Sequence, residues 1–431
     1  MRALCFWFGA ASAMLAALVD PVRGYQIVFL VALSQVLLVA QSRGNIFLLI
    51  HYVAILIYFS LAPAAQIVTD TSFWNVGLLD IASHQQALTI LLAYLVGVEL
   101  AALLTLQPAT QAPAPVRAQP LDNTAIALIT LATLVAFGLL FVKPSLNFVA
   151  RGVVGDEDSR PIELVFFSAL PKTVVLVGFV ALAINALHQR TWQAIGAALV
   201  LAAAAAAAGN PVNTARQIML IGLLPLVIYL LGWRHQLLLA GLIFGAVAGI
   251  GPVLNFFSRD GLYGVDIAAF PTGPDFDAMF IVAGLLERAP DVDWGYGRYL
   301  LSALSFMLPR DLKLFPDFDP LLWSAVGANF SQSNVSLPPF VTAFLDFGLA
   351  GSLLLGLAIG KVFQRVERAL YAGSPTPVVI LGALVLCSAY IPFLRGPIMG
   401  WGPFATSGIL AALLIGRLAM PAARPHVRNL T

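Results

Sequence analysis

The sequence predicts an all-α protein that crosses a membrane about twelve times. Only 10% of the 431 residues are charged, 60% are hydrophobic, and the mean hydropathy is +0.91. Soluble domains carry about 25% charged residues. The apolar runs are continuous over about 17–25 residues, which is the length of a transmembrane helix, and they lack the alternation of barrel strands. Since backbone groups in lipid must be hydrogen-bonded internally, we expect helices.

Twelve apolar runs and one long interruption give the predicted domain organisation. Nine candidate spans lie in residues 1–251, a large loop covers 252–336, three spans lie in 337–419, and a tail covers 420–431. The first run resembles a signal peptide, but no small-x-small cleavage site follows, so we interpret it as the first anchor. The candidate spans are 4–19, 24–40, 45–62, 86–106, 124–142, 164–187, 191–208, 215–232, 235–251, 337–360, 376–394 and 403–419.

The connections between these runs alternate in charge. One set holds eleven Lys and Arg residues against two acidic residues, and the other holds twelve against eighteen. Because cytoplasmic loops are enriched in Lys and Arg, this asymmetry predicts that both termini are cytoplasmic. The loops 63–85, 143–163 and 252–336 then face the outside.

The large loop 252–336 concentrates ionisable groups in a chain that is otherwise poor in them. Its stretch Phe276–Arg288 is amphipathic, which predicts a helix at the membrane surface. A second apolar run, Tyr299–Leu308, is too short to cross the bilayer and ends at Pro309. We therefore expect a polar or charged substrate to be handled at this loop.

Several arginines are predicted on the outer side. Arginine offers a planar fork of donors that matches a phosphate group. Two alternatives remain open for them: snorkelling of the side chain to the interface, and ion pairs with acidic loop residues. The candidates for binding a pyrophosphate are Arg216, Arg310 and Arg395, followed by Arg298 and Arg151.

Three acidic residues stand out. Asp346 lies well inside an apolar run, where a carboxylate is costly and faces a cavity or a partner. It is a candidate catalytic or sugar-binding group, or the partner of an arginine such as Arg216 or Arg395. Asp277 is the second candidate, although an acidic residue at a helix start also stabilises that helix. Glu99 is expected to make a buried contact between helices.

Other classes of site are not indicated. The sequence contains no His/Cys/Asp cluster with metal-ligand spacing and no Gly-rich phosphate loop, so we expect neither metal nor cofactor. Cys5 and Cys387 both lie in apolar runs, which gives no basis for a disulfide. The net charge of +2 gives no reason to expect binding to nucleic acid.

The order of these features resembles the oligosaccharide repeat-unit polymerases (Wzy-type O-antigen and exopolysaccharide polymerases) of bacterial inner membranes. The resemblance covers roughly residues 200–400. The chain departs from the family pattern at Thr342 and Phe344, where an acidic residue is expected, so the predicted catalytic carboxylate becomes Asp346. The residues that carry the resemblance are Asn213-Thr214-Ala215-Arg216, Phe276-Asp277-Ala278, Gly297, Pro309-Arg310, Ser331, Ser333, Pro338-Pro339, Asp346-Phe347-Gly348, Gly351 and Arg395-Gly396.

The resemblance implies a GT-C-like, metal-independent glycosyltransferase that acts at the outer leaflet. A growing glycan would pass from undecaprenyl pyrophosphate to a new lipid-linked repeat unit. Arg216, Arg310 and Arg395 would bind the pyrophosphate, and Asp346 or Asp277 would orient or deprotonate the acceptor. The implied partners are the lipid-linked oligosaccharide, a chain-length regulator and a flippase.

Two alternatives remain open. An O-antigen ligase has a similar layout but usually carries a histidine in its large outer loop, and residues 252–336 contain none. A flippase or other transporter of lipid-linked oligosaccharide would distribute charge on both sides of a cavity and show repeat symmetry. The charge here is one-sided, which favours the polymerase.

Overall fold

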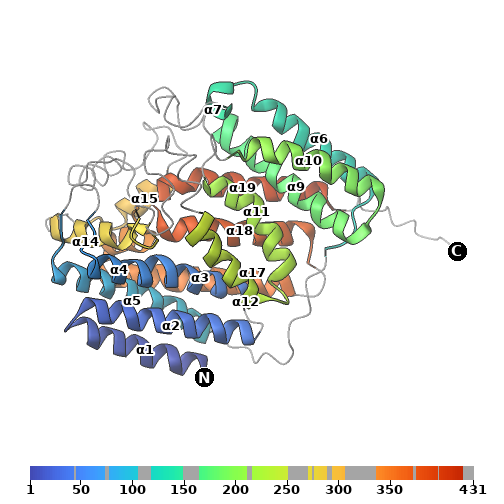
Figure 1. Cartoon of the computed structure of the whole chain (residues 1–431). Coiled ribbons are helices and arrows are strands. Elements are labelled where there is room, and N and C mark those ends of the chain that lie inside the picture. The colour runs from blue at the N-terminus through green and yellow to red at the C-terminus, as the bar shows by residue number, and fades with distance from the viewer. Residues whose placement is uncertain are drawn as a thin grey trace.

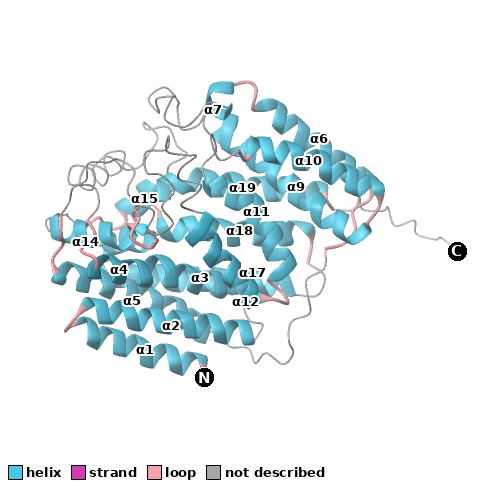
Figure 2. Cartoon of the chain, viewed as in Figure 1, coloured by secondary structure: helices cyan, strands magenta, loops and turns pink. Residues whose placement is uncertain are grey.

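The computed structural model of the protein describes residues 1–42, 45–72, 77–104, 118–148, 165–210, 216–250, 270–273, 276–288, 294–305, 336–371, 375–396 and 398–420. Throughout these residues the regular elements are helices, without a strand (Figure 1, Figure 2). The all-α prediction is therefore confirmed for the part of the chain that the structure describes.

A helix occupies each of the twelve predicted ranges. Six of them, judged over the described residues, are long and apolar enough to cross a membrane, so the protein is a multi-pass membrane protein. The helices are α1 (Arg2–Ala17), α2 (Pro21–Gln41), α3–η1–α4 (Ile46–Ala54, Ile55–Leu61, Ala62–Val68), α5 (Ile81–Leu104), α6 (Asn123–Leu139), η3–α9 (Val165–Ala169, Leu170–Gln189), α10 (Trp192–Ala208), α11 (Arg216–Leu231), α12–η4 (Gln236–Gly245, Ala246–Ile250), α17 (Pro339–Tyr371), α18 (Pro377–Arg395) and α19 (Ile398–Leu418).

Three short helices complete the described structure: α7 (Pro144–Phe148), α14 (Ala278–Arg288) and α15 (Arg298–Leu304). The last two belong to the predicted large loop. Figure 1 shows α14 and α15 at the end of the bundle away from the N-terminus, while α1 and α2 form one flank and α6 and α10 the other. The short helices of the loop thus gather at one end of the bundle.

Polar side chains set the starts of several helices. Asp20 accepts from Val22 N at 2.9 Å at the start of α2, and Asp122 accepts from Ala125 N at 2.7 Å at the start of α6. Such caps satisfy backbone donors that have no partner within the helix. Asp122 is thereby explained as a structural residue.

Helices α5 and α17 approach each other closely through glycines. A Cβ atom on Gly97 would collide with the backbone of Leu353, and one on Gly356 would collide with the backbone of Tyr94. Small residues allow this approach, and close packing stabilises helix pairs in lipid, where the hydrophobic effect between helices is absent.

Helix α17 contains a sharp reversal that the sequence did not predict. Phe347 (φ −141°, ψ 19°) and Gly348 (φ 64°, ψ −156°) leave the helical conformation. Gly348 takes a backbone conformation that is open almost only to glycine. The predicted span 337–360 is therefore wrong in its first part: residues 339–346 form a separate half-helix, and the long helix begins after Gly348.

Candidate functional site

The candidate site lies around the ring of Tyr58, at the end of the bundle that carries α14 and α15. The Tyr58 ring stacks on the Phe276 ring, with centroids 5.5 Å apart and planes at 23°. The guanidinium carbon of Arg395 lies 5.9 Å from the centroid of the Tyr58 ring, a cation–π distance. Asp277 directly follows Phe276 and is 1% exposed. The Tyr58–Phe276 pair thus contacts one predicted site residue, Arg395, and directly precedes another, Asp277, in the chain.

Gln66, near the end of α4, fixes the segment that leads to Asp277. Its Nε2 donates to the carbonyl oxygens of Phe276 at 2.9 Å and of Pro271 at 3.3 Å. Gln66 was not among the predicted site residues. The only available signal was a polar amide at the end of an apolar run, and polar groups inside spans usually have a specific partner.

Asp346 caps the N-terminus of α15. Its Oδ1 accepts from Tyr299 N at 3.1 Å, and its Oδ2 accepts from Leu300 N at 2.8 Å. A carboxylate at this position satisfies backbone donors and complements the helix dipole. Within the described residues, both oxygens of Asp346 accept backbone hydrogen bonds from α15.

The backbone around Asp346 adds two further hydrogen bonds to the same segment. Leu345 O accepts from Gly295 N at 3.0 Å, and Asp346 O accepts from Tyr296 N at 3.2 Å. The ring of Trp294 packs on Phe344 with centroids 5.9 Å apart. The tip of the α17 hairpin and residues 294–300 therefore form one docked unit.

The other arginines that were predicted to bind a pyrophosphate are not described beside Tyr58. Arg298 is the first residue of α15 and is exposed. Arg216 is the first residue of α11, which packs against α18 and α19, but its side chain is not described. Arg151 and Arg310 lie outside the described residues. Of the predicted site residues, Arg395 contacts Tyr58, Asp277 follows the residue that stacks on Tyr58, and Asp346 and Arg298 belong to the unit that contains α15.

The sequence predicted that the stretch Phe276–Arg288 forms a helix on the membrane surface, but the helix found there, α14, is buried inside the protein. Its side chains from Ala278 to Ala283 are between 0% and 3% exposed, and Leu285 is 2% exposed. The helix packs against α5 and η1. Its amphipathic pattern reflects burial inside the protein, with Glu287 near its end accepting from Asp80 N at 2.7 Å.

A second polar network joins α1, α3 and α5. Glu99, which is fully buried, accepts from Arg2 Nη2 at 3.1 Å and from Tyr52 OH at 2.5 Å. Beside it, His51 Nδ1 lies 2.7 Å from Tyr390 OH. The expected contact between helices at Glu99 is confirmed, and Arg2 is the partner that the sequence did not identify.

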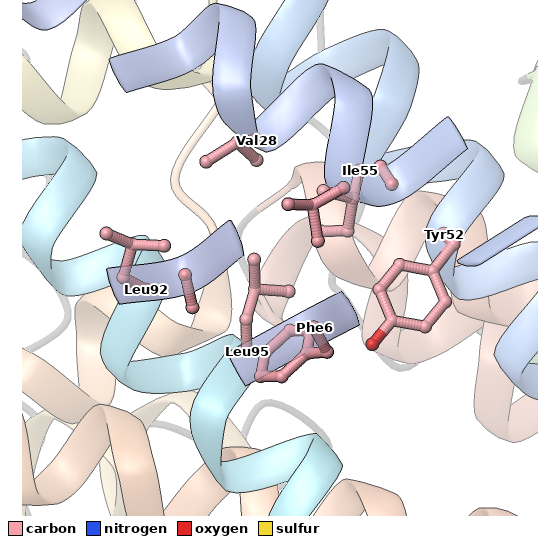
Figure 3. Close-up of a pocket in the computed structure, with 9 residues that line it drawn as sticks. Phe6, Val28, Tyr52, Ile55, Leu92 and Leu95 are labelled. Atoms are coloured by element: carbon pink, nitrogen blue, oxygen red, sulfur yellow. The ribbon is translucent and has the colours of Figure 1, made fainter. Parts of the chain in front are cut away.

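Neither a metal site nor the cavity in Figure 3 competes as a functional site. Groups of three or more His, Cys, Asp or Glu residues that could hold a metal are absent from the described part of the chain. The cavity in Figure 3 lies between α1, α2, α3, η1 and α5, and its lining is apolar apart from Tyr52, whose hydroxyl group donates to Glu99. The residues labelled there are Phe6, Val28, Tyr52, Ile55, Leu92 and Leu95.

Comparison with known proteins leaves the site to be interpreted from its own chemistry. Neither a protein-family model, nor a curated protein sequence, nor a solved structure matches this chain.

Proposed function

We propose that the protein is a membrane-embedded glycosyltransferase that polymerises undecaprenyl pyrophosphate-linked oligosaccharide units during synthesis of a bacterial surface polysaccharide. The observation that carries this proposal is the Tyr58 ring, which lies at a cation–π distance from Arg395 and stacks on Phe276, the residue directly before Asp277. The order of residues shared with repeat-unit polymerases supports it. A cation, a carboxylate and aromatic rings are the groups that a lipid-linked, negatively charged glycan requires.

The reaction breaks the bond between the glycan C1 and the pyrophosphate oxygen and forms a bond from C1 to an acceptor hydroxyl oxygen. The acceptor proton leaves with a base, and the lipid pyrophosphate leaves with the bonding electrons. Arg395, Arg216 and Arg310 stabilise the charge that develops on the leaving group. Arg298 and Arg151 attract the lipid-linked substrate at the outer rim.

The two carboxylates have different roles in this proposal. Asp277 orients or deprotonates the acceptor hydroxyl, a contribution that reaches about 10²–10⁴-fold in enzymes. Asp346 holds α15, because both of its oxygens already accept hydrogen bonds from that helix. It thereby fixes Arg298 and the start of the segment that leads to Arg310.

The proposed setting is the bacterial inner membrane, with twelve GT-C-like spans, cytoplasmic termini and the site at the outer leaflet. The asymmetry of Lys and Arg between the two sets of loops supports this orientation. A flippase would deliver the repeat units, and a chain-length regulator would control the number of transfers.

The test is the glycan ladder in a host whose own polymerase gene is deleted and replaced by variants of this chain. Wild type should restore the ladder, whereas Arg395→Ala and Arg310→Ala should leave a single repeat unit at equal protein level. Arg23→Ala is the control, since Arg23 is an exposed arginine paired with Asp20. Full-length polymer in both test variants would contradict the proposal that Arg395 and Arg310 bind the pyrophosphate.

Purified protein in proteoliposomes separates the alternatives. A polymerase lengthens the lipid-linked glycan in the absence of any other acceptor. A ligase needs a different acceptor lipid, and a transporter moves the lipid-linked unit without changing its length.

A further inference from the structure

Within the described residues, Gln66 contacts Pro271 and Phe276, which precede Asp277, through its amide nitrogen. The side chain is 2% exposed, and Nε2 reaches two carbonyl oxygens, those of Phe276 and Pro271. Phe276 is the residue whose ring stacks on Tyr58 and whose backbone leads directly into Asp277. One side chain on α4 therefore holds the backbone of Phe276, which carries the stacked ring and directly precedes Asp277.

The oxygen of the same amide is buried. Among the residues that the structure describes, Gln66 Oε1 has no hydrogen-bond partner. Leaving a buried acceptor unsatisfied costs about 1–3 kcal/mol. This cost offsets much of what the two hydrogen bonds contribute, so stability gives little reason for a glutamine here.

We propose that Gln66 is a positioning residue of the transferase site, which fixes Asp277 against the acceptor through the Phe276 carbonyl. The proposal rests on the proposed function and adds a residue that the family resemblance does not include. Loss of the amide donor releases the Phe276–Asp277 backbone while the helix that carried Gln66 stays folded. Misplacement of a catalytic group by about 1 Å costs about 10²-fold in rate.

Gln66→Met is the informative variant, because methionine has a similar length and carries no amide. The chain supplies a matched control in Gln35, which is fully buried and donates from Nε2 to Arg2 O at 3.1 Å. Its Oε1 likewise has no hydrogen-bond partner in the described part of the chain. Gln35 lies on α2 and contacts the polar network of Arg2 rather than the site. Gln35→Met therefore reproduces the loss of a buried amide without touching Asp277.

The measurement is the transfer rate in proteoliposomes, with lipid-linked repeat units extracted from the polymerase-deleted host and the rate normalised to folded protein. We expect Gln66→Met to lower kcat by about tenfold or more with KM unchanged, and Gln35→Met to leave both constants unchanged. Thermal unfolding of the two variants should shift alike. A purely structural role of Gln66 would not lower kcat in Gln66→Met alone while the thermal unfolding of both variants shifts alike.

The outcomes separate the two proposals. Active wild type together with a Gln66→Met variant of normal kcat would overturn the positioning role and leave the polymerase proposal standing. An equal fall of kcat in Gln66→Met and Gln35→Met would also overturn it, because a general effect of losing a buried amide would then account for both. Wild type that forms no polymer would overturn both proposals.

Discussion

Ser352 Oγ donates a hydrogen bond to the carbonyl oxygen of Phe340 at 2.7 Å, although the two residues are twelve positions apart. In a straight helix they would be about 18 Å apart along the axis. The half-helix 339–346 therefore folds back along the start of the long helix. This reversal places Asp346 at the N-terminus of α15, which it caps.

The reversal depends on Gly348. We expect Gly348→Ala to destabilise the fold by about 1–3 kcal/mol, because a Cβ is strained at φ 64° and ψ −156°. Gly196→Ala in α10 is the control: nothing lies within 4 Å of the added Cβ, and alanine favours a helix. The measurement is thermal unfolding in detergent. Equal melting temperatures for the two variants would mean that the reversal does not constrain position 348.

The cap formed by Asp346 predicts a local effect on α15. Asp346→Ala should destabilise α15 by about 1–2 kcal/mol, since Tyr299 N and Leu300 N lose their acceptor. Hydrogen exchange of residues 299–304 should then accelerate while α5 stays protected. Asp122→Ala removes a comparable cap from α6 and serves as the control, because it leaves the cap of α15 intact. Loss of polymer with unchanged exchange in α15 would instead favour a direct chemical role for Asp346.

The contact of Arg395 with Tyr58 predicts that lysine cannot replace this arginine. Lysine retains the charge but loses the planar fork that matches phosphate and stacks on a ring. We expect Arg395→Lys to leave the glycan ladder as short as Arg395→Ala does, and Tyr58→Phe to retain most of the polymer because the ring remains. A normal ladder in Arg395→Lys would show that the position requires charge alone.

The Arg2–Glu99 pair predicts a stability effect without a catalytic one. Arg2→Ala leaves the fully buried Glu99 with Tyr52 as its remaining partner, which should cost at most about 3 kcal/mol because Arg2 is itself 26% exposed. Glu99→Gln should cost less, since the amide oxygen still accepts from Tyr52. Thermal unfolding and the transfer rate per folded molecule check both variants. A reduced rate at normal stability would connect this network to the reaction.

Sequence patterns predicted the helices well because the length and polarity of an apolar run determine whether it is stable in lipid. The site was predicted only in part. Asp277 and Arg395 were predicted as charges in unusual places, but Tyr58 lies in an apolar run and Gln66 in the predicted loop 63–85, and both acquire their roles from contacts across the bundle. The reversal at Gly348 was missed for the same reason, since the hydrogen bond from Ser352 to Phe340 leaves no mark on local periodicity.

The orientation of the bundle is testable by cysteine labelling. Cys5 and Cys387 are replaced by serine, and single cysteines are introduced at Arg298 and at Arg368, both of which are exposed. Because the excess of Lys and Arg places the C-terminal end of α17, which includes Arg368, in the cytoplasm, an impermeant maleimide should label position 298 in the intact inner membrane of spheroplasts and position 368 only after permeabilisation. The reverse pattern would put the α15 unit, and with it Asp346, on the cytoplasmic side. Such a result would exclude an enzyme acting on substrates at the outer leaflet.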